Sequence, residues 1–173
     1  MSECLYALYD GRLMGEVLYR DDRLTFTYAD DWRRDPAAFP LSLSMPINTK
    51  VHGDKVVRAF VAGLLPDDSE VLRRWGQKFQ VSPRNPFRLL EHVGEECAGA
   101  VQFVIPEKAD LWLSGNTPAG VDWLDESEFE ERIQGLVADR SRARRLGDEG
   151  HFSLAGAQPK TGLYLDEENH RWG

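Results

Sequence analysis

The strongest constraint on this chain lies in its first 28 residues, where the dipeptide Asp10-Gly11 separates two apolar-rich runs, residues 5–8 and 13–18. An Asp-Gly pair between two such runs is among the strongest local signals for a β-hairpin. Residues 24–28 then alternate large apolar residues with threonines, which is typical of a strand with one buried face. The sequence therefore predicts an antiparallel meander of three strands at the start of the chain.

A proline-bounded segment follows the meander. Residues 39–46 alternate large apolar residues with serines between Pro40 and Pro46. Because proline has no N–H to donate to a β-ladder, this pattern favours an edge strand or another extended segment.

Three helices are expected next, and we expect them to cover the sheet. The first spans residues 55–65, with Asp54 as its N-cap. The second begins at Asp67 or Asp68 and breaks near Gly76 or shortly after it. The third begins at an Asn-Pro pair, which supplies an N-cap and a proline at the first helical position, and it stops at a glycine; these residues are Asn85, Pro86 and Gly94. The buried face predicted for the first helix consists of Val56, Ala59, Phe60, Gly63 and Leu64.

The rest of the chain suggests a second part. Residues 98–105 are expected to form a central strand that Pro106 ends. Residues 107–122 are rich in proline, glycine and polar side chains around an isolated Trp112, which marks a candidate domain boundary. Asp125 with Glu128 three positions later is typical of a capping box, so a helix is expected from there to about residue 138, burying Phe129, Ile133, Leu136 and Val137. The fold class predicted is α+β.

The charge of the chain limits the function classes that it can serve. The 173 residues carry a formal net charge of -8, which argues against binding nucleic acid through the whole surface. Residues 140–145 are a local exception with four arginines; they could contact an anion or an acidic partner, or form a solvated loop or helix end. No apolar run approaches the ~20 residues that cross a bilayer, so we expect no membrane partner and a cytoplasmic location.

Metal sites and nucleophilic triads are not expected. The two cysteines, Cys4 and Cys97, each lie in an apolar run and are predicted to be reduced and packed. The four histidines lack neighbours at ligand spacing, so no metal ligand is assigned. Ser42 and Ser44 lack the context of a nucleophile elbow.

Residues 152–165 hold the one stretch with a nucleotide-like pattern. Two short apolar runs flank a loop of small residues that contains Gly156 and Lys160. Glycine permits close backbone approach, successive N–H groups can form an anion-binding concavity, and the lysine adds a positive charge. The loop matches neither the P-loop pattern nor the kinase glycine-rich pattern, so local chemistry leaves open both phosphate binding and an ordinary hairpin.

Several of these segments together resemble the N-terminal part of HipA-family serine/threonine kinases, the toxins of bacterial toxin-antitoxin pairs. The resemblance extends over essentially the whole chain. It is carried by Gly11 with Gly15-Glu16, residues 24–28 before Trp32, residues 40–46, Phe60 with residues 64–67, Leu89-Leu90 with Gly94, residues 99–101 and, above all, residues 153–161.

The resemblance implies a division of the chain and a set of site residues. Residues 1–105 would form the small N-terminal subdomain, and residues 106–173 would begin a kinase-like N-lobe. Ser153 would be an autophosphorylation site. The loop over ATP would consist of Ala155, Gly156, Ala157, Gln158, Pro159 and Lys160. ATP and Mg²⁺ are the cofactors that the resemblance implies for the full-length protein.

The family also implies partners and a substrate. A small helix-turn-helix antitoxin of the HipB type would bind the toxin and bring DNA into the complex indirectly, and the protein substrates would be aminoacyl-tRNA synthetases. The aspartate and the Mg²⁺ ligands of phosphoryl transfer are expected beyond residue 173, so no catalytic residue is assigned and this chain alone is expected to be inactive. The alternative is a non-enzymatic subdomain of a split system that binds and restrains a separate kinase.

Overall fold

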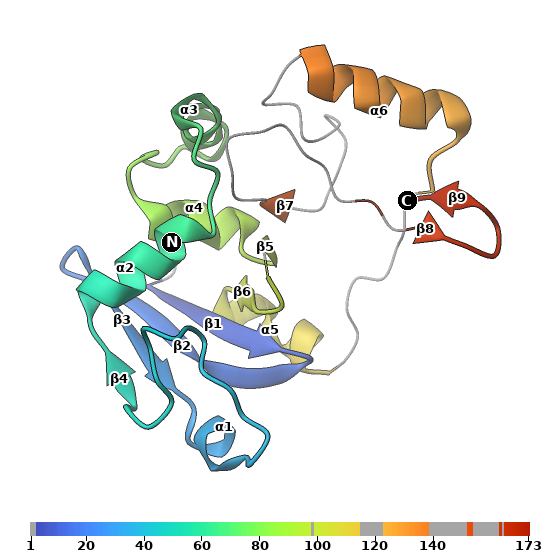
Figure 1. Ribbon diagram of the computed structural model, residues 1–173. Helices are drawn as coiled ribbons and strands as arrows, with labels where there is room; N and C mark the ends of the chain where they lie inside the picture. The colour runs from blue at the N-terminus through green and yellow to red at the C-terminus, as the bar shows by residue number, and fades with distance from the viewer. Residues whose placement is uncertain (1–2, 98, 115–122, 139–151, 154–162, 164) are drawn as a thin grey trace.

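The computed structural model describes residues 3–97, 99–114, 123–138, 152–153, 163 and 165–173. Its largest element is a five-stranded antiparallel sheet in the order β4-β3-β2-β1-β6 (Figure 1). The strands of this sheet are β1 (Cys4–Tyr9), β2 (Arg12–Arg20), β3 (Arg23–Tyr28), β4 (Val51–His52) and β6 (Gln102–Val104). The predicted meander is confirmed, because β1, β2 and β3 pair in sequence order.

The first hairpin turns where the sequence predicts it. Asp10 and Gly11 both have positive φ angles, of 47° and 68°, as a tight hairpin turn requires. The register then shifts by one residue at Met14, because Ala7 pairs with Gly15 while Leu8 pairs with Leu13. A Cβ on Gly15 would lie 2.4 Å from the carbonyl oxygen of Thr27, so only glycine fits the close approach of β3.

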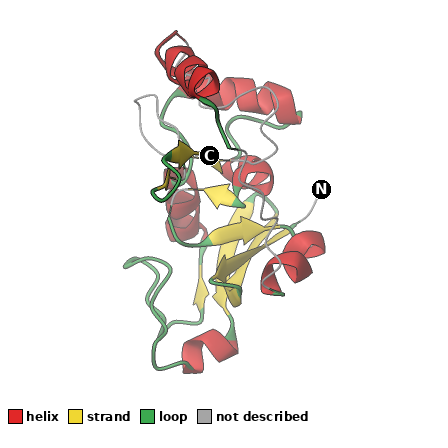
Figure 2. Cartoon of the chain, turned by 90° about the vertical axis from the view of Figure 1, so that its right-hand side faces the viewer, coloured by secondary structure: helices red, strands yellow, loops and turns green. Residues whose placement is uncertain are grey.

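Helices cover both faces of the sheet (Figure 2). α2 (Asp54–Gly63) and α4 (Pro86–Val93) pack over one face, and α3 (Ser69–Phe79) lies against α4. α5 (Pro106–Leu113) packs against β1 on the opposite face, where Leu8, Val104, Ala109 and Trp112 form a second buried cluster. The other described helices are α1 (Asp30–Arg34), which is short, and α6 (Glu126–Ala138), which is longer. An α+β architecture is therefore confirmed.

The helix boundaries predicted from capping residues hold for α3 and α4. The Asp68 side chain accepts a hydrogen bond from the Glu70 N–H at the start of α3. Asn85 caps α4 through the Arg88 N–H, with Pro86 at the first helical position. α3 continues past Gly76 to Phe79 and ends at Gln80, which adopts a left-handed conformation.

The prediction for α2 is wrong by one residue at its start and by two at its end, and its buried face is right only in part, because Leu64 is buried and Val56 and Phe60 pack against the core. Gly53 is the N-cap, and Asp54 lies in the first turn. The Asp54 carboxylate accepts the Leu24 N–H at 2.7 Å and pairs with Arg58, which together keep the pKa of Asp54 below its usual value. The fully buried residues are Val57 and Val61, whereas Ala59 and Gly63 of the predicted face are exposed. Tertiary contact with β3 sets this orientation.

Within residues 39–46, residues 42–45 form a turn, so the segment is not an edge strand. An isolated bridge joins Ser42 to Met45, and the Met45 N–H donates to the Ser42 carbonyl oxygen at 2.9 Å. The edge strand is instead β4, which sequence patterning missed because two residues are too few to show alternation. The turn is held by Tyr28, whose hydroxyl donates to the Met45 carbonyl oxygen and accepts the Leu41 N–H at 2.7 Å.

The segment after residue 97 departs further from expectation. The predicted central strand reduces to β6, three residues long at the edge of the sheet. Pro106 does not end a strand but begins α5, because a proline fits the first helical position without loss of a hydrogen bond. Trp112 is consequently 8% exposed in the second buried cluster rather than isolated in a boundary loop.

We predict that Tyr28→Phe lowers the free energy of unfolding by ~1–3 kcal/mol, because the Leu41 N–H and the Met45 carbonyl oxygen would lose their partner. Urea denaturation followed by circular dichroism measures the change. Tyr6→Phe is the matched control, since Tyr6 is a half-buried tyrosine on β1. An equal change in both variants would show that the Tyr28 hydroxyl has no special role.

Candidate functional site

Ser153 lies on β7 (Phe152–Ser153), and its strand is placed by the N-terminal part of the chain. β7 pairs in parallel with β5 (Glu96–Cys97), with Phe152 opposite Glu96 and Ser153 opposite Cys97. The six residues predicted to lie over ATP are outside the described residues; they are Ala155, Gly156, Ala157, Gln158, Pro159 and Lys160. The structure thus places the backbone of Ser153 alone among the predicted site residues.

The position of β5 depends on Gly94, which ends α4. The Gly94 N–H donates to the Leu90 carbonyl oxygen at 2.8 Å, and the Gly94 carbonyl oxygen accepts the Phe103 N–H at 2.7 Å. A Cβ at this position would lie 2.4 Å from the Phe103 carbonyl oxygen and 2.6 Å from that of Leu90. Glycine is therefore required for α4 to pass this close to β6, and β5 begins two residues later.

The cysteines next to this region are structural. Cys97 is buried, its Sγ donates to the Val101 carbonyl oxygen, and burial raises the pKa of its thiol to about 12. Burial, followed by the charge of Glu16, raises the pKa of Cys4 to about 11. Neither of these cysteines forms a disulfide, and both thiols are protonated at neutral pH, so neither is an activated nucleophile. The prediction of reduced cysteines is confirmed, with Cys97 buried and Cys4 half-buried.

The two apolar runs that flank the predicted loop have different partners. β7 pairs with β5, whereas β8 (Leu165–Asp166) pairs with β9 (Arg171–Trp172). The simple hairpin that local chemistry left open is therefore not formed by the described strands on either side of the loop. A parallel partner more than 50 residues earlier in the chain leaves no local sequence signal.

The last described part of the chain packs around tryptophans. The predicted capping box is confirmed at α6, where Asp125 and Glu128 exchange backbone-to-carboxylate hydrogen bonds of 3.0 and 2.8 Å. Phe129 stacks on Trp172 with ring centroids 5.7 Å apart. Two residues predicted to be buried on α6 are not: Ile133 is 40% exposed and Val137 is 81% exposed.

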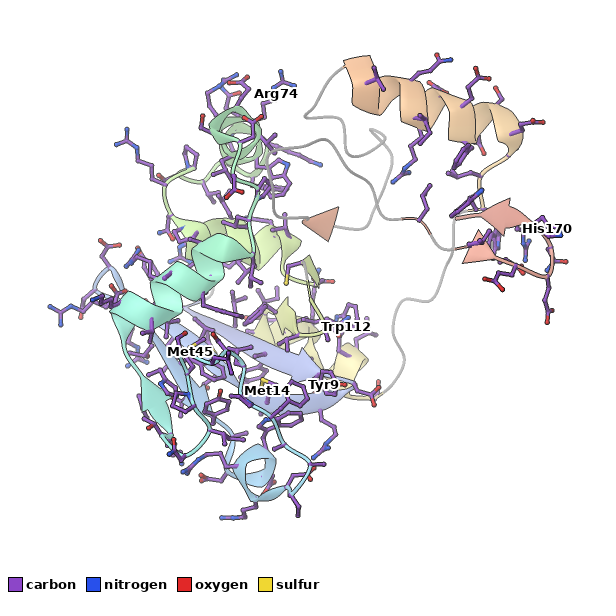
Figure 3. The ribbon with its side chains drawn as sticks, viewed as in Figure 1. Tyr9, Met14, Met45, Arg74, Trp112 and His170 are labelled. Carbon is purple, nitrogen blue, oxygen red and sulfur yellow. The ribbon has the colours of Figure 1, made fainter. Side chains whose placement is uncertain are left out.

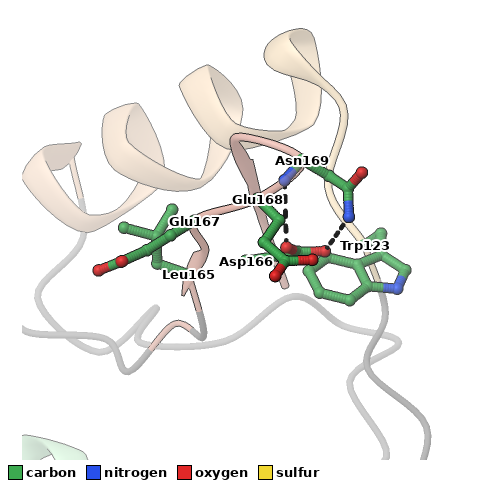
Figure 4. Close-up of a pocket in the computed structure, with 6 residues that line it drawn as sticks. All are labelled: Trp123, Leu165, Asp166, Glu167, Glu168 and Asn169. Atoms are coloured by element: carbon green, nitrogen blue, oxygen red, sulfur yellow. Dashed lines mark hydrogen bonds between the residues drawn. The ribbon is translucent and has the colours of Figure 1, made fainter.

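A shallow hollow lies beside Trp123 (Figure 4). It has a volume of about 490 Å³ and is lined by Trp123, Leu165, Asp166, Glu167, Glu168 and Asn169. The Asn169 side chain and then Arg171 hold the pKa of Asp166 below its usual value, and the Arg171 guanidinium lies 3.7 Å from the Trp123 ring centroid. Three carboxylates would repel a polyphosphate, so the hollow does not fit ATP.

No group of three or more metal-ligating side chains occurs in the described part of the chain. The described residues therefore offer no carboxylate cluster that could hold Mg²⁺, and no chemical step is assigned to them. Among the helices that can be described, none is long and apolar enough to cross a membrane.

Three comparisons with known proteins find similar chains. A family model described as the HipA N-terminal domain matches residues 5–104. The putative kinase Y4mE of Sinorhizobium fredii is 35% identical over 160 residues, which cover 91% of this chain and 37% of the relative. The serine/threonine-protein kinase toxin HipA of Shewanella oneidensis is 28% identical over 157 residues, which cover 89% and 33% of the two chains.

A solved structure supports the fold. The complex of Shewanella oneidensis HipA and HipB with operator DNA contains a chain that matches with a TM-score of 0.66 and 24% identity, over 97% of this chain and 37% of that chain. The present chain spans about a third of the length of the curated relatives that it matches.

We predict that Gly94→Ala lowers the free energy of unfolding by ~1–3 kcal/mol, because its methyl group would force α4 and β6 apart. Gly63→Ala is the control, since a Cβ at that position meets nothing within 4 Å and the change should leave stability unchanged or raise it by up to ~1 kcal/mol. Chemical denaturation of both variants measures the difference. Equal stabilities would mean that α4 and β6 can separate freely.

Proposed function

The chain belongs to the HipA family, whose N-terminal domain its residues 5–104 match, and we propose that it is the N-terminal portion of a toxin kinase. The full-length protein would transfer the γ-phosphate of ATP to serine or threonine of a protein substrate. The observation that carries this proposal is the family match, and its relatives include a serine/threonine-protein kinase toxin and a putative kinase. Its substrates would belong to the class of aminoacyl-tRNA synthetases.

The proposed division assigns residues 1–105 to the N-terminal subdomain and residues 106–173 to the beginning of the kinase N-lobe. α5 packs against β1, so the segment that begins the second part contacts the first. The β5–β7 pairing supplies a second link, because it joins the strand of Ser153 to the end of the subdomain. This link supports a role for the subdomain in positioning the segment that leads into the ATP loop.

The proposed nucleotide loop runs from Ala155 to Lys160, and the proposed autophosphorylation site is Ser153. Backbone N–H groups of the loop and the Lys160 ammonium would face the phosphates of ATP, which supplies the transferred phosphoryl group. The Mg²⁺ ligands and the catalytic aspartate would come from the part of the protein beyond residue 173. A dianionic phosphate on Ser153 would compete for the same N–H groups and for Lys160, and would thereby displace the loop.

The proposed partner is a helix-turn-helix antitoxin of the HipB type. The solved neighbour is a complex of HipA, HipB and operator DNA, which supports an antitoxin that brings DNA to the toxin. The complex would act in the cytoplasm, where its protein substrates and ATP are present.

We predict that the full-length protein incorporates one phosphate that is lost in Ser153→Ala, because the acceptor hydroxyl is removed. Intact-mass spectrometry after incubation with ATP and Mg²⁺ measures the added mass. Ser127→Ala is the control, since Ser127 is an exposed serine in the first turn of α6. A phosphate that persists in Ser153→Ala would place autophosphorylation elsewhere.

We also predict that Lys160→Ala weakens ATP binding by the full-length protein, with a loss of roughly tenfold for one charge-assisted contact. Isothermal titration calorimetry measures the affinity, and Lys55→Ala on the exposed side of α2 is the matched control. Unchanged affinity in Lys160→Ala would show that the loop is not part of the nucleotide site.

The 173-residue chain alone should transfer no phosphate, because the catalytic aspartate and the Mg²⁺ ligands are expected beyond residue 173. Tight inhibition of a separate kinase by this chain would instead favour the split arrangement.

A further inference from the structure

The segment between α1 and β4 presents one large apolar side chain to solvent. Leu43 is 95% exposed, which is the highest value among the large apolar residues in the described part of the chain; the next is Val137 at 81%. A single exposed leucine is ordinary on a protein surface. Residues 35–50 around it, however, contain no helix or strand, and loops longer than about 12–15 residues without secondary structure are usually functional.

The aliphatic neighbours of Leu43 in this segment face the opposite way. Met45 is completely buried, and Leu41 and Ile47 pack against the core. Figure 3 labels Met45 among the interior side chains. In the edge strand that the alternation favoured, Leu41, Leu43 and Met45 would share one buried face. The turn at residues 42–45 instead leaves Leu43 outside, so its exposure is a consequence of the fold that the sequence pattern does not contain.

Hydrogen bonds close the turn on both sides of this leucine. The Met45 N–H donates to the Ser42 carbonyl oxygen at 2.9 Å, and the Ser44 N–H donates to the Ser42 hydroxyl at 3.3 Å. The two serine hydroxyls lie 3.0 Å apart and bond to each other. The Tyr28 hydroxyl bonds to the backbone immediately before the turn and at its last residue. We call residues 42–44, with Leu43 at their centre, the Leu43 apex.

Two side chains of α1 tie the flanks of the Leu43 apex to the domain. On the side before the apex, Trp32 Nε1 donates to the Phe39 carbonyl oxygen at 3.1 Å. On the side after it, the Arg33 guanidinium donates to the carbonyl oxygens of Ile47 and Asn48, at 3.1 and 3.2 Å. The apex is therefore held in place from both sides, and a contact with a partner would cost little further ordering of the backbone.

The size of the Leu43 apex decides what kind of partner fits it. A stable interface between separate proteins buries roughly 800 Å² on each partner. The apex offers one leucine between two serines, which is a small part of such an area. A covalently attached partner is already held at a high effective concentration and loses little freedom of movement on contact, so one apolar side chain can suffice. These observations favour an occupant within the same protein.

We propose that Leu43 docks into an apolar pocket on the part of the full-length protein beyond residue 173. The proposal rests on the proposed function in one respect, namely that the kinase lobes continue there. This chain spans about a third of the length of its curated relatives, so a protein of their length has ample chain to supply the pocket. The contact would attach the N-terminal subdomain to the kinase at a second place, besides the pairing of β5 with β7, and would fix its orientation.

The test compares the rates of thiol labelling of Leu43→Cys and Leu111→Cys in the full-length protein. Leu111 on α5 is the matched control, because it is a leucine that is 48% exposed. Exposure in this chain alone predicts that Leu43→Cys reacts at least as fast as the control. Docking predicts the reverse order, with Leu43→Cys roughly tenfold slower, since a docked thiol reacts only when the contact opens. Labelling with N-ethylmaleimide followed by peptide mass spectrometry assigns a rate to each position.

A photo-crosslinker at the same position identifies the occupant. Leu43→p-benzoylphenylalanine in the full-length protein should form a crosslink within one copy to a peptide beyond residue 173. Labelling of Leu43→Cys as fast as that of the control would overturn the proposal, and so would the absence of a crosslink within one copy. Crosslinks between two copies that disappear on dilution, or crosslinks only to an added antitoxin, would overturn it in favour of that partner.

The docking test and the kinase test fail separately. Labelling and crosslinking at residue 43 need neither ATP nor Mg²⁺, whereas the proposed kinase is read from the phosphate that the unaltered full-length protein incorporates. Slow labelling of Leu43→Cys in a protein that incorporates no phosphate would support the docking and contradict the kinase. Fast labelling in a protein that does incorporate phosphate would contradict the docking alone.

Discussion

Two hydrogen bonds of the Tyr28 hydroxyl connect the sheet to the segment that leads from α1 to β4. Its position at the end of β3 lets it bond simultaneously to the Met45 carbonyl oxygen and the Leu41 N–H, while its ring packs edge-on against Phe26 and His52. The turn at residues 42–45 is thereby tied to the sheet, and β4 follows in place beside β3. α2 starts directly after β4, so the cover of one sheet face also depends on this buried contact. A buried hydroxyl that satisfies two backbone groups is costly to remove, because each group would lose its partner.

Close backbone approach is the second constraint, and it links the sheet to the candidate site. Gly15 lets β3 approach β2, and Gly94 lets α4 end against Phe103. The second contact determines where β5 begins, and β5 pairs with the strand that carries Ser153. A methyl group at residue 94 would therefore disturb the contact between α4 and Phe103 that immediately precedes β5. The proposed coupling between the N-terminal subdomain and the kinase N-lobe would therefore act through the pairing of β5 with β7, and not through shared catalytic groups.

Charge is divided unevenly over the molecule. Exposed cations on α3, such as Arg73 and Lys78, contrast with the hollow beside Trp123, which Asp166, Glu167 and Glu168 line. The net charge of -8 therefore does not describe the charge of each part of the surface. Net charge describes the field at long range, whereas contacts depend on which side chains the fold brings together.

The sequence by itself determined the features whose signals are local. The Asp10-Gly11 turn, the alternation that ends in Tyr28, and the caps at Asp68, Asn85 and Asp125 each depend on interactions within a few residues. The family resemblance also came from the sequence, and the ATP loop that it implies lies outside the described residues. Only the tertiary structure decided that Asp54 bonds to β3, that β6 is an edge strand, that Trp112 is buried and that β7 pairs with β5. These features join residues distant in the chain, and their free energy comes from burial and pairing that no short window of sequence contains.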